Sequence, residues 1–415
     1  MYQALYRKYR SQTFGQLVGQ QVVARTLRQA VEQEKISHAY LFSGPRGTGK
    51  TSVAKIFAKA MNCPNQVNGE PCNDCYICES ITNGSLEDVI EIDAASNNGV
   101  DEIRDIRDKS TYAPSLAKHK VYIIDEVHML STGAFNALLK TLEEPTENVV
   151  FILATTELHK IPATILSRVQ RFEFKSIKLP DIVHHLESIL ATEGIAYEAD
   201  AVQIIARRAE GGMRDALSIL DQALSLTAGS ELTTAIAEEI TGSISLAALD
   251  QYVAAILAHD ATAALDQLAI IFDNGKNMAR FVTDLLQYLR DLLIVQTGGE
   301  NTHNSDLFAA NLEADQARLF ALIDQATTSL ADIKNSLQPR IYTEMMTIKL
   351  AESTDQVSNS AAVEVPSNVL AQLEDLKKEV AQLKQQLAQS GSSLPASKPA
   401  VTRPTKSSKG YRADR

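Results

Sequence analysis

The feature that most constrains this chain is a glycine loop at residues 44–51, with the sequence GPRGTGKT. It fits the phosphate-loop pattern G-x-x-x-x-G-K-[ST] at every fixed position. The run at 38–43 predicts a short buried strand, and the run at 52–61 has apolar residues at helical spacing. Between a strand and a helix, such a loop turns backbone amides and a helix N-terminus towards phosphate, which favours a nucleoside triphosphate site over an ordinary turn. The residues expected to line it are Gly44, Pro45, Arg46, Gly47, Thr48, Gly49, Lys50, Thr51 and Ser52.

Two side chains of this loop have distinct chemistry. Lys50 would reach the β- and γ-phosphates, and the Thr51 hydroxyl would take a position on Mg²⁺. The sequence therefore predicts ATP or a similar nucleotide with Mg²⁺ as cofactors.

Composition excludes several other classes of protein. The 415 residues are 45% hydrophobic and 22% charged, as in ordinary globular chains of roughly two to four domains. No apolar run approaches the ~20 residues of a membrane span, and the N-terminus does not have the pattern of a signal peptide, so we expect a cytoplasmic location and no membrane partner. The net charge of −11 argues against a basic surface all round but permits a local basic channel.

A basic and aromatic segment precedes the loop. It contains Tyr6 and Arg10, and Val18 follows before a predicted helix at about 22–33. Such a segment can cradle an adenine base, or it can be a surface arm that packs against the core. Composition alone leaves both interpretations open.

The chain has four cysteines, all between residues 63 and 78. Their spacing is C-x8-C-x2-C-x2-C, and overlapping C-x2-C steps suit tetrahedral Zn²⁺. Disulfides are the weaker interpretation for a cytoplasmic chain, and a redox pair would leave two cysteines unexplained. With four ligands no position stays open for a catalytic water, so we expect a structural zinc site at Cys63, Cys72, Cys75 and Cys78.

The run at 88–93 predicts another buried strand. A second nucleotide motif follows about 75 residues after the glycine loop, where the apolar run 121–124 ends in Asp125 and Glu126. At the end of a parallel strand Asp125 is placed to hold Mg²⁺, and Glu126 to polarise the attacking water. His128 lacks partners at ligand spacing, and we interpret it as structural.

Two further polar positions are ambiguous on their own. Thr156, with Thr155 beside it, ends the predicted strand 149–154; it can sense the γ-phosphate or simply cap the strand. Arg168 precedes a short predicted strand; it can be a surface ion-pair partner or, in an oligomeric ATPase, a finger on a neighbour's nucleotide.

Taken together these motifs resemble the AAA+ superfamily, and within it the gamma/tau ATPase family of the bacterial DNA polymerase III clamp loader. The resemblance rests on residues 14–20, the glycine loop, the inserted cysteine module, 90–96, 125–130, 136–145 and the pair at 167–168, and it covers about residues 1–350. The family usually has cysteine where this chain has Val169, which does not affect the charged position.

The resemblance implies a fold and further roles. The fold would be an α/β AAA+ P-loop domain with a parallel sheet and a zinc-module insertion, followed by a helical lid and an all-α collar. Thr156 would be the first sensor, Arg168 would act in trans, and Arg214 would reach the γ-phosphate from the lid. Residues 14–20 resemble the adenine-side box of AAA+ ATPases, which favours binding of the base by Tyr6, Arg10 and Val18. Arg104 and Lys140 would contact DNA phosphates independently of base sequence, unless they are ordinary solvated helix charges.

The expected domains are 1–178 for the nucleotide-binding domain, with the zinc module at 63–78, 179–242 for the lid and 243–353 for the collar. Within the lid the sequence predicts three helices, at 181–193, 200–209 and 213–227. Residues 354–415 are expected to form a linker, a short coiled-coil-like helix at 369–389 and a basic disordered tail. The function of that helix and tail is open, and polymerase or helicase contacts would require a longer form.

The predicted function is an ATPase that loads a ring-shaped sliding clamp onto primed DNA, within a ring of its own copies and companion loader subunits. Another AAA+ motor, such as a branch-migration helicase, and a non-hydrolysing scaffold are the alternatives. We expect no polymerase active site, because Asp125 is committed to nucleotide Mg²⁺.

Overall fold

The computed structural model describes residues 3–227, 231–299 and 305–352 of the chain. The predicted linker, helix and tail at 354–415 lie outside the described residues.

A five-stranded parallel sheet forms the centre of the N-terminal region, with strand order β2-β3-β4-β1-β5. The order of the strands across the sheet differs from their order in the chain. Parallel strands must be joined by crossover connections, which here contain helices that pack on the faces of the sheet. The strands are β1 (Ala39–Ser43), β2 (Val89–Asp93), β3 (Lys120–Asp125), β4 (Val149–Thr155) and β5 (Gln170–Glu173).

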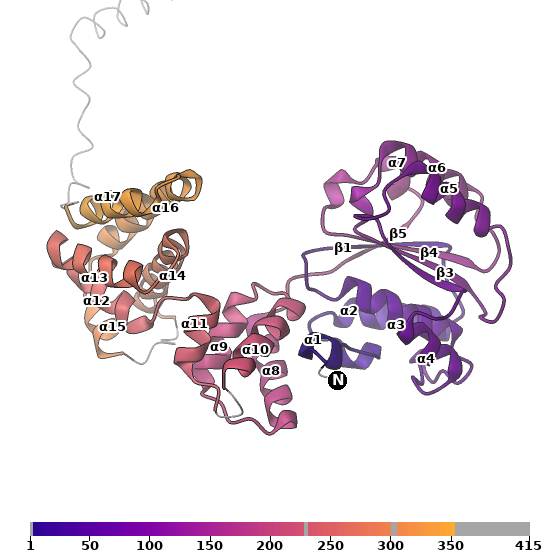
Figure 1. Ribbon diagram of the computed structural model, residues 1–415, viewed down its shortest axis with the longest axis horizontal. Coiled ribbons are helices and arrows are strands. Elements are labelled where there is room, and N and C mark those ends of the chain that lie inside the picture. Colours follow the sequence, from indigo (N-terminus) through magenta and orange to yellow (C-terminus); the bar gives the residue numbers. More distant parts are fainter. Residues whose placement is uncertain (1–2, 228–230, 300–304, 353–415) are drawn as a thin grey trace, which may run out of the picture. The chain divides into compact units, whose positions relative to one another are not determined.

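Helices cover both faces of this sheet (Figure 1). Alternate residues of β1 point to opposite faces: Tyr40 and Phe42 pack with α2 (Gln21–Glu32) and α3 (Lys50–Asn62). Leu41 joins the opposite core, with α5 (Val100–Lys109), α6 (Thr132–Glu143) and α7 (Ala163–Leu166). Burial on both faces explains why β1, β3 and β4 read as continuous apolar runs.

The strand at 88–93 departs from expectation. It was predicted to be buried, but the side chains of β2 are exposed or only partly buried. The reason is its place at the edge of the sheet, where β3 covers only one side.

Shorter elements surround the sheet. They are α1 (Leu5–Lys8), η1 (Phe14–Gln16), α4 (Tyr76–Asn83), η2 (Val127–Met129) and η3 (Leu158–Lys160).

A helical region with its own core follows the sheet. The three helices predicted here are present as α8 (Leu179–Glu193), α9 (Ala199–Arg208) and α10 (Met213–Thr227). A fourth, α11 (Thr234–Thr241), was missed, and its Ala237 packs into the same core.

The remaining described helices share a separate core. They are α12 (Leu246–Leu257), α13 (Ala261–Asp273), α14 (Met278–Gln296), α15 (Asp306–Asn311), α16 (Gln316–Asn335) and α17 (Pro339–Glu352). No described helix is by itself long and apolar enough to cross a membrane; α11 and α12, bent by 73° at their junction, meet that length and composition test only as a pair. The predicted fold class, a P-loop sheet domain followed by two helical regions, is confirmed.

Candidate functional site

The glycine loop joins β1 to α3, and its glycines are required by close contacts. Gly44 has φ +145°, and a Cβ there would lie 2.1 Å from the carbonyl oxygen of Phe174. Gly47 has φ +76°, and its Cβ would lie 2.9 Å from the Cα of Gly212. Only glycine fits these positions, because both combine a left-handed backbone with a neighbour at contact distance.

Lys50 begins α3 and is buried within the loop. Its Nζ donates to the carbonyl oxygens of Gly44 at 2.8 Å and Pro45 at 2.7 Å. Burial lowers the pKa of Lys50, and the carboxylates of Glu126 and Asp125 oppose that shift. The amine is thus held at the centre of the loop and close to both acidic residues.

Thr51 and Asp125 meet at the carboxyl end of β3. The Thr51 hydroxyl donates to Oδ2 of Asp125 at 2.6 Å, and the amide of Glu126 donates to Oδ1 at 2.9 Å. A hydroxyl and a carboxylate are hard oxygen donors of the kind that Mg²⁺ prefers, so this pair fits the expected metal. Glu126 has φ +47°, a left-handed backbone conformation that is uncommon for residues other than glycine.

Glu126 has two polar neighbours. The hydroxyl of Thr156 donates to its Oε2 at 3.2 Å. Nδ1 of His128 lies 3.5 Å from the same oxygen and 3.0 Å from the hydroxyl of Thr155, while Nε2 lies 3.3 Å from Glu157. The contacts of His128 with Thr155 and Glu157 were not predicted from the sequence. These two residues lie at and just after the end of β4, far from His128 along the chain, so no regular spacing points to them.

The N-terminal segment packs against two regions at once. Leu5 belongs to the core of the α8–α11 region, and Val18 packs against that core. Phe14 instead belongs to the core between the sheet and the helices α2 and α3. Nε of Arg10 donates to the hydroxyl of Ser52 at 2.9 Å, immediately after the glycine loop.

Arg214, at the start of α10, approaches the same segment. Its guanidinium lies 5.5 Å from the ring centroid of Tyr6. Its backbone amide donates to the carbonyl of Gly47 at 3.4 Å. The structure therefore brings Tyr6, Arg10 and Arg214 close to the glycine loop.

Arg168 has partners elsewhere. Its guanidinium forms an ion pair with Glu143 at 2.8 Å and donates to the carbonyl of Thr164 at 2.7 Å. Within the described residues, no contact joins it to Lys50, Asp125 or Glu126. Arg168 is thus separate from the group that converges on the loop.

The two expected DNA contacts lie on neighbouring helices. Arg104, on α5, is 57% exposed and pairs with Asp101 at 2.9 Å. Lys140, on α6, is also exposed, and α5 packs against α6. Both side chains are accessible to an anionic partner.

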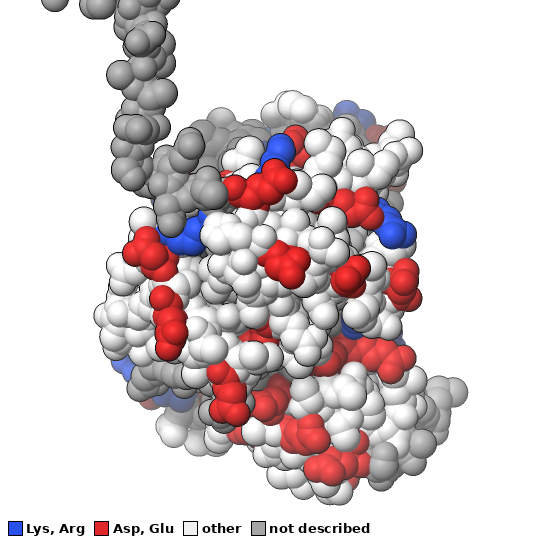
Figure 2. Space-filling model, turned by 90° about the vertical axis from the view of Figure 1, so that its left-hand side faces the viewer, with Lys and Arg blue, Asp and Glu red and all other residues white. Residues whose placement is uncertain are grey.

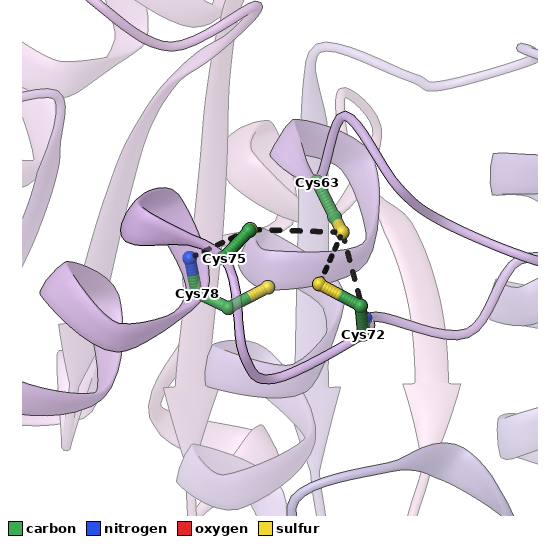
Figure 3. Close-up of side chains that lie close together, drawn as sticks. All are labelled: Cys63, Cys72, Cys75 and Cys78. Carbon is green, nitrogen blue, oxygen red and sulfur yellow. Dashed lines mark hydrogen bonds between the residues drawn. The ribbon is translucent and has the colours of Figure 1, made fainter.

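The four cysteines converge at one point (Figure 3). Their sulfur atoms all lie within 4.8 Å of one another, with Cys63 and Cys72 separated by 3.4 Å and Cys63 and Cys75 by 4.0 Å. Four thiolates around tetrahedral zinc at ~2.3 Å require separations of roughly 3.8 Å, so this donor set fits Zn²⁺. The cysteines are free rather than disulfide-bonded.

The thiols differ in acidity. Burial raises the pKa of Cys78, and it raises the pKa of Cys72 to about 11. For Cys75 burial acts in the same direction, but the amide of Cys78 and the neighbouring thiols outweigh it and lower the pKa. A divalent cation bound here would displace protons, since cysteine binds metal as the thiolate.

Comparison with known proteins identifies the family. The DNA polymerase III delta subunit family matches residues 19–178, the ATPase lid domain of the DNA polymerase III clamp loader subunit matches 181–229, and domain III of DNA polymerase III subunits gamma and tau matches 232–365. The DNA polymerase III subunit tau of Bacillus subtilis is 48% identical over 92% of this chain and 69% of its own length. The chain belongs to the DNA polymerase III gamma/tau family.

Other relatives in this family are longer than the matched part. The subunit tau of Escherichia coli is 51% identical over 57% of this chain, but that match spans only 36% of the relative. The gamma/tau subunit of Mycobacterium tuberculosis is 37% identical over 87% of this chain and 64% of its own length. Among solved structures, the Thermotoga maritima RuvB Holliday junction branch migration motor has 17% identity and a TM-score of 0.42, covering 60% of this chain and 79% of that one.

Proposed function

We propose that this member of the gamma/tau family is the ATP-hydrolysing subunit of a clamp loader, which uses ATP to place a sliding clamp on primed DNA. One observation carries the proposal: Lys50, Thr51, Asp125, Glu126 and Thr156 converge at the carboxyl ends of adjacent strands. That edge of an open parallel sheet is where such folds bind ligands. The intact set argues against a non-hydrolysing scaffold.

The chemistry follows from the geometry of these side chains. ATP phosphates would take the place of the Gly44 and Pro45 carbonyls as partners of the Lys50 amine. Thr51 and Asp125 would hold Mg²⁺, which neutralises charge on the β- and γ-phosphates. Glu126 would accept a proton from the attacking water, while Thr156 fixes its orientation.

His128 has a positioning role in this proposal. Its ring lies between Glu126 on one side and Glu157 on the other, and its side chain is 7% exposed. A ring held by Thr155 limits the directions in which the Glu126 carboxylate can move. We therefore add His128 to the groups that orient the general base.

Arg214 and Arg168 would act from different chains. Arg214 lies beside the loop of its own chain, so it would contact the γ-phosphate in cis. Arg168 is bound to Glu143 and would reach the nucleotide of an adjacent subunit. We propose a ring of copies and companion loader subunits, joined through the region at 243–353.

An exposed apolar face on α17 supports that assembly role. Its members are between 37% and 49% exposed, and a face of this kind favours a protein partner over water. They are Ile341, Tyr342, Met345 and Ile348.

DNA would contact the chain at Arg104 and Lys140, through phosphates and without base specificity. On the face shown in Figure 2 the charged side chains are mainly acidic, which does not favour contact with phosphate. We also propose that the domains span 1–178, 179–242 and 243–353 and that residues 63–78 hold a structural zinc ion. The proposed location is cytoplasmic. Polymerase and helicase contacts would belong to longer forms of the family.

Steady-state ATP hydrolysis tests the proposal. The purified chain is assayed with and without primed DNA, clamp and companion subunits. We expect strong stimulation that requires the complete set. Hydrolysis that is indifferent to clamp and primer would leave an ATPase with another client, and no hydrolysis under any condition would reject the enzymatic role.

A further inference from the structure

The cysteine module and the glycine loop are joined by one helix. α3 begins at Lys50 in the loop and ends at Asn62, immediately before Cys63. Its 13 residues span about 20 Å at 1.5 Å per residue. The helix alone fixes the distance between the two sites, but it does not explain why the module also contacts the N-terminal segment.

The first such contact is made by Glu70. Its carboxylate accepts from the backbone amides of Phe14 at 2.8 Å and Gly15 at 3.0 Å. Glu70 lies on a tight hairpin, where Asn68 and Gly69 both have positive φ and Val67 pairs with Glu70 in both directions. The hairpin therefore presents the carboxylate in one orientation.

The hairpin is itself fixed against the P-loop domain. A Cβ on Gly69 would lie 2.3 Å from the carbonyl oxygen of Arg28 on α2, so this turn packs directly on that helix. The guanidinium of Arg28 lies 3.9 Å from Glu70. Glu70 is thus held on a rigid support rather than at the end of a free loop.

The second contact runs through a buried lysine. Lys59, on α3, is 1% exposed. Its Nζ donates to the side-chain oxygens of Gln12 at 2.7 Å and Asn73 at 2.5 Å. Asn73 lies between Cys72 and Cys75 in the sequence, so one residue of the cysteine loop is also a direct partner of Lys59.

From Gln12 the path continues to the loop. The Gln12 side chain donates to the carbonyl of Arg10 at 3.0 Å, and Arg10 donates to Ser52 at 2.9 Å. Both contacts of the module therefore end on the N-terminal segment beside the nucleotide site. No residue of this path is needed to hold a zinc ion.

We propose that the cysteine module positions residues 10–16, beside the nucleotide site, through Glu70 and Lys59, so that a metal-loaded module raises nucleotide affinity. This inference rests on the proposed function, because it needs ATP to bind at the glycine loop. By thermodynamic linkage, bound nucleotide must stabilise the loaded module by the same factor. Glu70 and Lys59 are positioning residues, since they act through the segment and not on the nucleotide.

The test compares Glu70→Ala and Glu70→Gln with wild type in the full chain. The matched control is Glu79→Gln, which changes an exposed carboxylate on α4 of the same module. Binding of a fluorescent ATP analogue gives affinity, metal analysis gives zinc content, and transfer of zinc to a colorimetric chelator gives its release rate. We expect Glu70→Ala to bind roughly five- to twentyfold more weakly with full zinc content, and Glu79→Gln to match wild type.

Three outcomes decide the matter. Nucleotide should slow zinc release from wild type and not from Glu70→Ala, and steady-state KM should rise in that variant while kcat stays unchanged. Wild-type affinity in Glu70→Ala, together with zinc release that ignores nucleotide, would overturn the coupling. Failure of the wild-type chain to bind the analogue would instead reject the proposed nucleotide site. The test does not depend on protein without zinc, which can unfold, because the Glu70 variants and the rates of zinc release are all measured on the zinc-loaded chain.

Discussion

Replacing Arg168 with alanine should remove hydrolysis from the assembled ring without weakening the folded chain. The ion pair with Glu143 is at the surface, with side chains 33% and 48% exposed, and such pairs contribute about 0–1 kcal/mol. An arginine that reaches a neighbour's γ-phosphate accelerates hydrolysis by about 10³–10⁵, or roughly 4–7 kcal/mol of transition-state stabilisation. The two effects differ enough in size to be measured separately.

The assay measures kcat in the assembled oligomer and unfolding by urea in the same preparation. Arg107→Ala is the matched control, because Arg107 also pairs with a carboxylate at 2.7 Å and is 35% exposed. We expect kcat to fall by about a thousandfold or more in Arg168→Ala, with stability changed by less than about 1 kcal/mol. The control should be close to wild type in both measurements.

Mixing two inactive variants tests whether the arginine acts in trans. Lys50→Ala chains lack a working phosphate site but keep Arg168, and Arg168→Ala chains have the reverse defect. In a random mixture, about a quarter of the interfaces would join an intact loop to an intact arginine, so activity should partly return. No recovery, in mixed rings shown to assemble, would refute the assignment of Arg168 to a neighbour's site.

Three further variants test the site and its support. Lys50→Ala should weaken nucleotide binding roughly ten- to hundredfold, as measured by titration, because it removes charge-assisted bonds to phosphate. Glu126→Gln should keep binding and lower kcat by about 10²–10⁴, since the general base is lost; equal loss of both would contradict that role. Asp88 is 2% exposed and accepts amide bonds from Ser115 and two following residues, so Asp88→Asn should cost about 1–3 kcal/mol in urea unfolding at neutral pH.

The pH dependence of the Asp88 effect has a definite sign. Burial alone would raise the pKa of Asp88, but the amide donors outweigh it and hold the pKa below its usual value. A carboxylate with a depressed folded-state pKa stabilises fully above its unfolded value, near 3.9, and loses this contribution as pH falls through the folded value. The difference between wild type and Asp88→Asn should therefore be constant above about pH 5 and shrink in stronger acid, and a difference that grows on acidification would refute the argument.

The sheet and the phosphate site were predictable because their signals are local. β1, β3 and β4 are continuous apolar runs. Thr51 is the last residue of the glycine-loop motif, and Asp125 is the last residue of β3, so the motif and the strand place both residues. The exposure of β2 was not predictable, because the place of a strand within a sheet depends on strand order. α11 was missed although Thr233 stands at its N-cap and Gly242 at its C-cap, because its eight residues make only about two turns and give a short apolar period.

The contacts of His128 and Glu70 could not be read from spacing. His128 meets groups from the end of β4, and Glu70 meets amides 56 and 55 positions away in sequence. Their partners are fixed by packing of separate elements rather than by a repeat along one helix or strand. The dipeptide Asn68-Gly69 favours a tight hairpin turn. The amides of Phe14 and Gly15 that Glu70 then binds cannot be inferred from the local sequence.

The N-terminal segment shows why two interpretations of one sequence need not exclude each other. Composition left open whether it cradles adenine or packs as an arm. The structure shows the packing, with Leu5 in the α8–α11 core and Phe14 in the core between the sheet and the helices α2 and α3. We propose that the segment also contacts adenine, and the packing favours this, because a segment fixed at both ends loses little further conformational freedom when a base binds. The N-terminal segment therefore contacts the cysteine module, the α8–α11 region and the residue after the glycine loop. Glu70→Ala removes the first of these contacts without changing a cysteine ligand, a residue of α8–α11 or a residue of the loop.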